Sequence, residues 1–205
     1  IRRQRQMCIR DRTETGLLAL DAKVIIDDDH RPGEQFAGLS EAADYWEGVI
    51  RINEYQKERY VLNMLAAMFN TLAGKKICCL GFAFKADTGD TRESPAIFVA
   101  RRLVEEQAQV VVSDPKALPN ARLDLEDLGE AVQYVEDPYE AARGAHALAV
   151  ITEWPQYRDL DYERIYRNMH KPAFVFDGRN ILDHQMLHQI GFNVYPIGKP
   201  PLTHF

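Results

Sequence analysis

The pattern of apolar positions changes at Gly74, from a helical repeat before it to short buried runs after it. Ser40 is a suitable N-cap and Gly74 a suitable C-cap for the first segment. Apolar residues at the three-and-four spacing of an amphipathic helix lie between them: Ala42, Tyr45, Trp46, Val49, Ile52, Leu62, Leu65, Ala66 and Phe69. The pattern predicts one long helix within residues 39–74, with two shorter helices separated near Asn53 as the alternative. Because helices usually have about 11–12 residues, one this long typically bridges domains or forms a subunit interface.

After Gly74, short apolar runs alternate with amphipathic segments. The runs predict strands at residues 77–84, 109–113, 132–135, 147–152, 173–176 and 192–197. Helices are predicted at 95–106, 138–144, 160–169 and 184–190, with a polar connection at about 116–131. Buried runs between helices are typical of a parallel sheet covered on both faces, joined by right-handed crossovers. The sequence therefore predicts an α/β fold, a Rossmann-like doubly wound parallel sheet preceded by a long connecting helix.

These patterns divide the chain into residues 1–38, 39–74 and 75–205. Residues 1–38 are unassigned, since their arginines show no amphipathic spacing. Residues 27–30 (DDDH) are interpreted as a solvated turn, because three adjacent acids cannot all face one metal ion. The chain begins at Ile1, and we expect it to be a fragment of a longer protein.

Composition narrows the functional classes. Apolar residues make up 46% and charged residues 27%, as in ordinary globular proteins. The net charge of -6, without a basic patch interleaved with aromatics, argues against a nucleic-acid partner. Without an apolar run long enough to span a bilayer, no membrane partner is expected. Cys8, Cys78 and Cys79 form no disulfide framework; the adjacent pair is expected to behave as small hydrophobic residues, which suits a reducing, cytoplasmic location.

Charged and glycine-rich segments follow the predicted strands, where a doubly wound sheet binds its ligands. One rim is expected to carry Phe84-Lys85, Asp114, residues 152–154 and residues 177–179. Lys85 and Arg92 flank a loop rich in Gly and Thr, which suits a ligand carrying phosphates. Within this rim, Asp87 and Asp90 are expected to pin the loop through Asx-turns, and Glu153 and Trp154 to pack beneath it.

The loop after the first strand is not a dinucleotide fingerprint. Phe82, Phe84 and Lys85 stand where Gly-x-Gly-x-x-Gly needs small residues, so this domain is not expected to bind NAD in the usual way. Asp114 is then interpreted as a turn residue before Pro115. No metal is expected: His184 and His188 are four apart on a predicted helix, but are interpreted as surface residues.

Several segments together carry a family resemblance. They are residues 45–56, 81–85 (GFAFK), 87–94 (DTGDTRES), 113–116 (SDPK), 137–140 (DPYE), 152–154 (TEW), 160–164 (LDYER) and 171–179 (KPAFVFDGR). From about Leu39 onward the chain resembles the UDP-glucose/GDP-mannose dehydrogenase family. The combination of GFAFK with DTGDTRES is the most specific part of the match.

The resemblance implies an N-terminal NAD-binding Rossmann domain, a central helical dimerisation region and a C-terminal UDP-sugar domain, of which this chain has the last two. It implies that Phe84 and Lys85 contact UDP-glucose, that Arg179 contacts the substrate, and that Arg92 reaches the NAD. A homo-oligomer formed through the long helix is implied as well. The family reaction is a double oxidation of the sugar C6 alcohol to a carboxylate, with two NAD and a thioester on a catalytic Cys.

The chain departs from the family before the long helix. Residues 1–38 contain neither a Gly-x-Gly-x-x-Gly fingerprint nor the family's Cys-Phe-x-Lys-Asp stretch, and Cys8 lies in MCIRD instead. No catalytic residue is therefore assigned, and the fragment alone is expected to be inactive. A stand-alone nucleotide-sugar-binding module, and a Rossmann-like domain with only a structural role, remain alternatives. An upstream reading frame carrying both missing motifs would favour the enzyme.

Overall fold

The computed structural model describes the backbone of residues 40–205, with side chains from Gly48 onward. The predictions for residues 1–38, including Cys8 and the acidic run at 27–30, lie outside the described residues. The chain divides into two units, Ile1–Glu58 and Arg59–Phe205, and the second holds the sheet. None of the helices in the described part is long and apolar enough to cross a membrane.

Helix α3 (Ser40–Ala67, 28 residues) is shorter than the sequence predicts. It runs without a break at Asn53, so the single-helix interpretation is confirmed, but it ends well before Gly74. Phe69 and Asn70 follow with φ of 65° and 56°, left-handed values that cannot continue an α-helix. The Asn70 N–H then returns to the Leu65 carbonyl at 2.9 Å, which closes the helix end.

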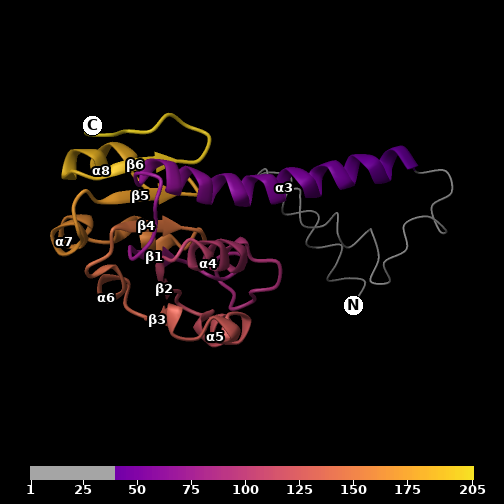
Figure 1. The fold of residues 1–205 in the computed structure, drawn as a ribbon, viewed down its shortest axis with the longest axis horizontal. Helices are drawn as coiled ribbons and strands as arrows, with labels where there is room; N and C mark the ends of the chain where they lie inside the picture. Colours follow the sequence, from indigo (N-terminus) through magenta and orange to yellow (C-terminus); the bar gives the residue numbers. More distant parts are fainter. Residues whose placement is uncertain (1–39) are drawn as a thin grey trace. The chain divides into compact units, whose positions relative to one another are not determined.

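The second unit is built on a six-stranded, all-parallel sheet (Figure 1). Its strands are β1 (Lys76–Leu80), β2 (Gln109–Ser113), β3 (Val132–Tyr134), β4 (Ala147–Val150), β5 (Phe174–Asp177) and β6 (Asn193–Pro196). Their order, β3-β2-β1-β4-β5-β6, is that of a doubly wound Rossmann sheet, so the predicted fold class is confirmed. The first strand ends four residues earlier than predicted, because Gly81 turns the chain with a φ of 93°.

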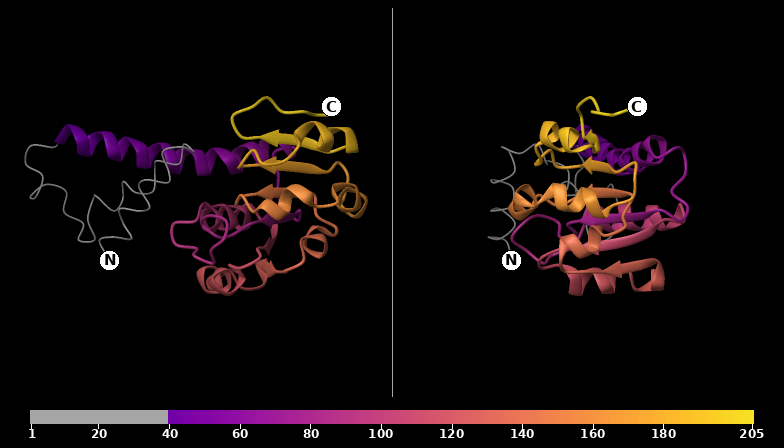
Figure 2. Two further views of the ribbon diagram at one scale, coloured as in Figure 1. Left: turned by 180° about the vertical axis from the view of Figure 1, so that it is seen from behind. Right: turned by 90° about the vertical axis from the view of Figure 1, so that its left-hand side faces the viewer.

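Helices lie on both faces of the sheet (Figure 2). They are α4 (Pro95–Glu105), α5 (Leu118–Asp124), α6 (Pro138–Ala142), α7 (Tyr162–Asn168) and α8 (His184–Ile190), with 3-10 segments η1 (Glu126–Ala131) and η2 (Pro155–Asp159). The prediction of α4, α6, α7 and α8 is confirmed. The polar connection predicted after β2 was wrong, since α5 and η1 lie there. Helix α5 has no side-chain cap and buries only Ala121, so it leaves little sequence signal.

The core is centred on strands β1 and β4, whose residues are almost completely buried. Cys78 and Cys79 are 0% and 1% exposed, which confirms their role as small hydrophobic residues. Burial raises the pKa of Cys79 to about 12, so its thiol stays protonated at neutral pH. The last turns of α3 join this core through Val61 and Met64.

Candidate functional site

The loops after β1 and β4 meet at the point where the strand order reverses, which is where doubly wound sheets bind ligands. Their approach is close: a Cβ on Gly81 would lie 2.4 Å from the Thr152 Cβ, so only glycine fits there. The Thr152 hydroxyl donates to the Ala83 carbonyl at 2.6 Å. This contact holds the start of the Phe84-Lys85 loop against the end of β4.

Asp114, at the end of β2, is hydrogen-bonded to three of the loops that form the rim. Its carboxylate is 1% exposed and accepts from five N–H groups, which is more than a turn residue needs. The donors are the backbone N–H groups of Phe82 (2.7 Å), Ala83 (3.0 Å), Lys116 (2.8 Å) and Ala117 (2.7 Å), and the Trp154 indole (3.0 Å). A buried carboxylate that accepts this many hydrogen bonds has its acceptor capacity satisfied without a cation beside it.

Asp114 therefore ties together the loops after β1, β2 and β4. The prediction that it sits in a turn is confirmed by its bond to Lys116, but its wider role was missed. The prediction that Trp154 packs beneath the rim is also confirmed, since its ring is 4% exposed. The direction of the carboxylate matters chemically. It faces the protein's own N–H groups and not a crevice where a dinucleotide ribose would lie.

Asp177, at the end of β5, holds the other side of the rim. It is completely buried and accepts from the backbone N–H groups of Arg179 (3.0 Å) and Leu182 (3.0 Å) and from His184 Nε2 (2.9 Å). The side chain of His184 is only 13% exposed, so its interpretation as a surface residue was wrong. Its position is set by the buried carboxylate, which a pattern of helical spacing does not reveal.

The Phe84-Lys85 loop is closed by its own backbone. The Phe84 N–H donates to the Asp90 carbonyl at 2.8 Å, and the Asp90 carboxylate accepts from the Arg92 N–H at 3.0 Å. The second bond is an Asx-turn, as predicted for Asp90. Phe84 is half-buried and Lys85 exposed, and no ion pair joins Lys85 to any other residue in the described part. Its ammonium is therefore available to an anion.

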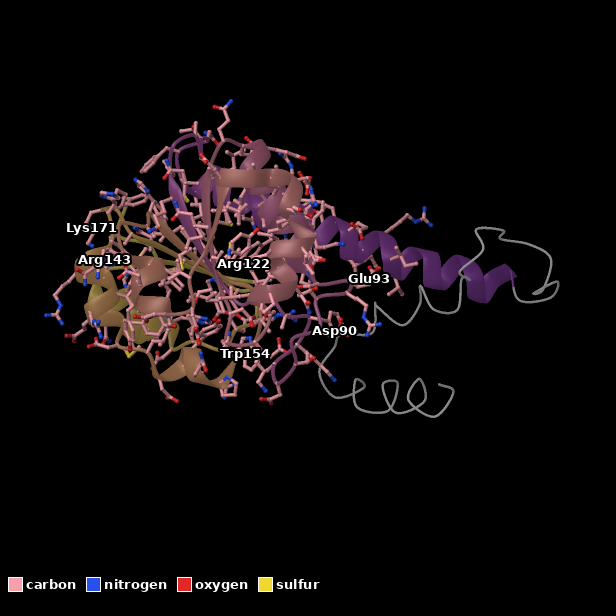
Figure 3. All side chains as sticks on the ribbon, turned by 90° about the horizontal axis from the view of Figure 1, so that it is seen from below. Asp90, Glu93, Arg122, Arg143, Trp154 and Lys171 are labelled. Atoms are coloured by element: carbon pink, nitrogen blue, oxygen red, sulfur yellow. The ribbon has the colours of Figure 1, made fainter. Side chains whose placement is uncertain are left out.

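Arg92 differs from Lys85, because its guanidinium already has a partner. It donates to both carboxylate oxygens of Asp90, the shortest bond being 2.6 Å, while 86% of its side chain remains exposed. These bonds hold the pKa of Asp90 below its usual value. Figure 3 shows Asp90 and Glu93 at one end of this unit, with Arg143 and Lys171 at the other.

Arg179 lies against the end of β4. Its Nε donates to the Ile151 carbonyl at 2.5 Å and lies 3.2 Å from Glu153 Oε2, with 13% of the side chain exposed. Gly178 permits this approach, because a Cβ there would lie 2.9 Å from the Val150 carbonyl oxygen. The pairing of Arg179 with Glu153 was not predicted, since it needs the ends of β4 and β5 side by side.

The structure thus brings Phe84, Lys85 and Arg179 to one rim and places Arg92 on the loop beside them. No group of three or more potential metal ligands occurs among the described residues. His188 is half-buried and stacks on His204 with ring centroids 4.1 Å apart, so its surface assignment was also incomplete.

Comparison with known proteins shows which family has a domain of this kind. The profile described as the UDP binding domain of the UDP-glucose/GDP-mannose dehydrogenase family matches residues 78–184, just over half of the chain. The chain belongs to the UDP-glucose/GDP-mannose dehydrogenase family. The matched region runs from β1 to the start of α8, and so includes every rim residue described above.

Individual members of the dehydrogenase family are also similar to this chain in sequence and structure. UDP-glucose 6-dehydrogenase 1 of Arabidopsis thaliana is 48% identical over 182 residues, which are 80% of this chain and 38% of that protein. The UDP-glucose 6-dehydrogenase of Drosophila melanogaster is 49% identical over 171 residues, 78% of this chain and 36% of its own length. A UDP-glucose dehydrogenase structure from Pyrobaculum islandicum superposes with a TM-score of 0.61 at 35% identity, covering 75% of this chain and 32% of that one. The chain spans about a third of the length of these relatives.

Proposed function

We propose that this chain is the UDP-sugar-binding portion of a UDP-glucose 6-dehydrogenase. Such an enzyme converts UDP-glucose, two NAD and water to UDP-glucuronate and two NADH. The observation that carries the proposal is the rim at the switch point, where two buried carboxylates, Asp114 and Asp177, fix loops that present Lys85 and Arg179. Membership in the family supplies the class of ligand.

In this proposal Lys85 and Arg179 bind the ligand, and Phe84 packs against it. Lys85 is exposed and unpaired among the described residues, which suits a diphosphate. Arg179 has one N–H on the Ile151 carbonyl, so its terminal nitrogens remain for the ligand. The half-buried ring of Phe84 supplies an apolar surface beside the lysine.

The residues of this domain do not form an NAD cradle. The loop after β1 carries Phe82 and Lys85 where a dinucleotide needs glycines, and the Asp114 carboxylate is occupied by five internal donors. Arg92, whose side chain is largely exposed on its loop, is the residue proposed to reach a cofactor phosphate. NAD, which accepts hydride in this chemistry, is therefore expected to bind mainly to a part of the enzyme beyond this domain.

We assign no catalytic residue to this chain. Both cysteines of the sheet are buried, and burial raises the pKa of each thiol. The chain alone is expected to produce no NADH from UDP-glucose and NAD in an absorbance assay; measurable turnover would contradict this.

We place the enzyme in the cytoplasm, where free thiols persist. A tagged protein found in the secretory pathway would contradict that placement.

Helix α3 is the proposed contact between subunits. Ile52 and Tyr55 are 60% and 62% exposed, and Leu62, seven residues after Tyr55, is 46% exposed. Large apolar side chains exposed at this spacing suit a helical interface. Tyr55→Glu with Leu62→Glu is expected to convert the oligomer to a monomer in sedimentation velocity. An unaltered chain that sediments as a monomer at micromolar concentration would contradict the interface.

The function itself is tested by calorimetric titration of the chain with UDP-glucose and, separately, with NAD. The rim predicts saturable binding of UDP-glucose and no binding of NAD, because the loop after β1 cannot take the dinucleotide. Binding of NAD with no binding of UDP-glucose would overturn the proposal.

A further inference from the structure

Glu153 occupies a fixed position on the rim but has no structural task of its own. The residues on either side are anchored: Thr152 bonds the Ala83 carbonyl at 2.6 Å, and the Trp154 indole bonds Asp114 at 3.0 Å. Both neighbours are nearly inaccessible, whereas the Glu153 side chain keeps 34% of its surface exposed. The backbone thus holds a carboxylate at the surface of the site.

The partner of Glu153 is Arg179, and the pair is only half satisfied. Glu153 Oε2 lies 3.2 Å from Arg179 Nε, but the one N–H on that nitrogen is used by the Ile151 carbonyl. Oε2 is buried and accepts no hydrogen bond from any residue in the described part. Of the guanidinium nitrogens, only Nε is hydrogen-bonded within residues 40–205. Buried polar atoms without partners are uncommon and unfavourable, so the pair is poised to gain them from a ligand.

The missing partners define the chemistry of that ligand. Arg179 can still donate through its terminal nitrogens, and Glu153 can still accept. A phosphate group satisfies only the arginine and is repelled by the carboxylate. A hydroxyl both donates and accepts, so two neighbouring hydroxyls on a sugar ring satisfy both residues. The pair is also close to neutral in total, which favours an uncharged group.

We propose that Glu153 and Arg179 together bind vicinal hydroxyls of a sugar ring, and that Glu153 is a specificity-determining residue of this site. The diphosphate then lies on the side of Lys85, whose ammonium has no carboxylate partner among the described residues. This inference rests on the proposed function, and assigns the polar groups of its ligand to separate parts of the rim. Both sugars of UDP-glucose, the glucose and the ribose, carry such hydroxyls.

The test is calorimetric titration of the unaltered chain and of Glu153→Gln with three ligands. UDP-glucose carries both sets of hydroxyls, UDP carries only those of ribose, and 2′,3′-dideoxy-UDP carries none. Glutamine preserves the shape of the side chain while removing its charge, so the fold is retained. Glu130→Gln is the matched control, because Glu130 is exposed and precedes β3, at the opposite edge of the sheet.

For Glu153→Gln we expect an affinity loss of about tenfold or more for UDP-glucose, as for hydrogen bonds to charged groups, and no loss for dideoxy-UDP. A loss confined to UDP-glucose assigns the pair to glucose, and an equal loss for UDP assigns it to ribose. Equal changes for all three ligands, or none, would overturn the inference while leaving the proposed function intact. Failure of the unaltered chain to bind any of the three would refute both.

Discussion

The two ends of the parallel sheet use opposite charges to hold their loops. At the carboxyl ends of the strands, the buried carboxylates of Asp114 and Asp177 accept from backbone N–H groups. At the amino ends, lysine ammonium groups donate to backbone carbonyls. Lys75 bonds Thr71 O at 2.6 Å, Lys76 bonds Arg143 O at 2.6 Å, and Lys171 bonds Met169 O at 2.9 Å and also Tyr166 O.

The difference follows from the fold. In a doubly wound sheet, helices begin near the carboxyl ends of the strands and finish near the amino ends. Unsatisfied N–H groups therefore lie near the carboxyl ends of the strands, and unsatisfied carbonyls lie near the amino ends. Carboxylates hold the loops at the carboxyl ends of the strands, which leaves Lys85 available to a ligand. At the amino ends, the lysines themselves hold the loops. A cluster of basic residues is thus not sufficient evidence of an anion site.

The largest effect expected from this comparison is at Asp114. Asp114→Ala would leave five N–H groups without their acceptor. A buried donor left unsatisfied costs about 1–3 kcal/mol, so a total loss of about 3 kcal/mol or more is expected. Urea denaturation would measure the change in free energy of unfolding. The matched variant, at the amino ends of the strands, is Lys171→Met. In the unaltered chain Lys171 is exposed, and its ammonium donates to two backbone carbonyls.

Lys171→Met is expected to cost no more than about 1 kcal/mol, the size of an ordinary exposed interaction. Equal costs for the two variants would show that the buried carboxylate has no special role in the rim. The comparison would then have to be abandoned.

The sequence predicted the scaffold of this rim better than its interior. The apolar pattern located β2 and α8 at their observed ends. The sequence also predicted that Lys85 and Arg179 lie on the same side of the sheet, because the carboxyl ends of parallel strands all lie there. It could not predict the five donors of Asp114, which come from three loops whose approach depends on Gly81 and Thr152. The pairing of Glu153 with Arg179 was hidden for the same reason.

Helix ends and solvent exposure were the other weak points. Left-handed backbone at Phe69 and Asn70 ended α3 although apolar spacing continued to Phe69. His184 has the spacing of a surface residue, yet Asp177 draws it inward. The first outcome depends on backbone conformation and the second on one side-chain hydrogen bond, and periodicity encodes neither.

A smaller effect is expected at the amino-terminal edge, at His146. Its Nδ1 accepts from the Lys76 N–H at 3.1 Å, and its ring lies beside that of His170 with centroids 4.6 Å apart. Burial, followed by the positive charges of His170 and Lys75, lowers the pKa of His146 below 6.5. The unfolded chain then binds the proton more readily than the folded one, so stability is lost as pH falls from about 6.5 through the folded pKa.

His146→Asn keeps an acceptor for Lys76 but cannot be protonated. Its free energy of unfolding should therefore decline less than that of the unaltered chain between about pH 7.5 and about 5.5. Parallel pH profiles for the two proteins, measured by denaturant titration, would show that this histidine does not contribute.

The most direct test of the account compares the two edges in one binding experiment. UDP-glucose is titrated into the unaltered chain, into Lys85→Ala with Arg179→Ala, and into Arg143→Ala with Arg167→Ala. Each double variant removes two positive charges, and Arg143 and Arg167 are exposed residues next to the amino ends of β4 and β5. The account predicts that the rim variant loses about a hundredfold or more in affinity while the other binds normally. Equal affinities for the two double variants would contradict the assignment of the site to this rim.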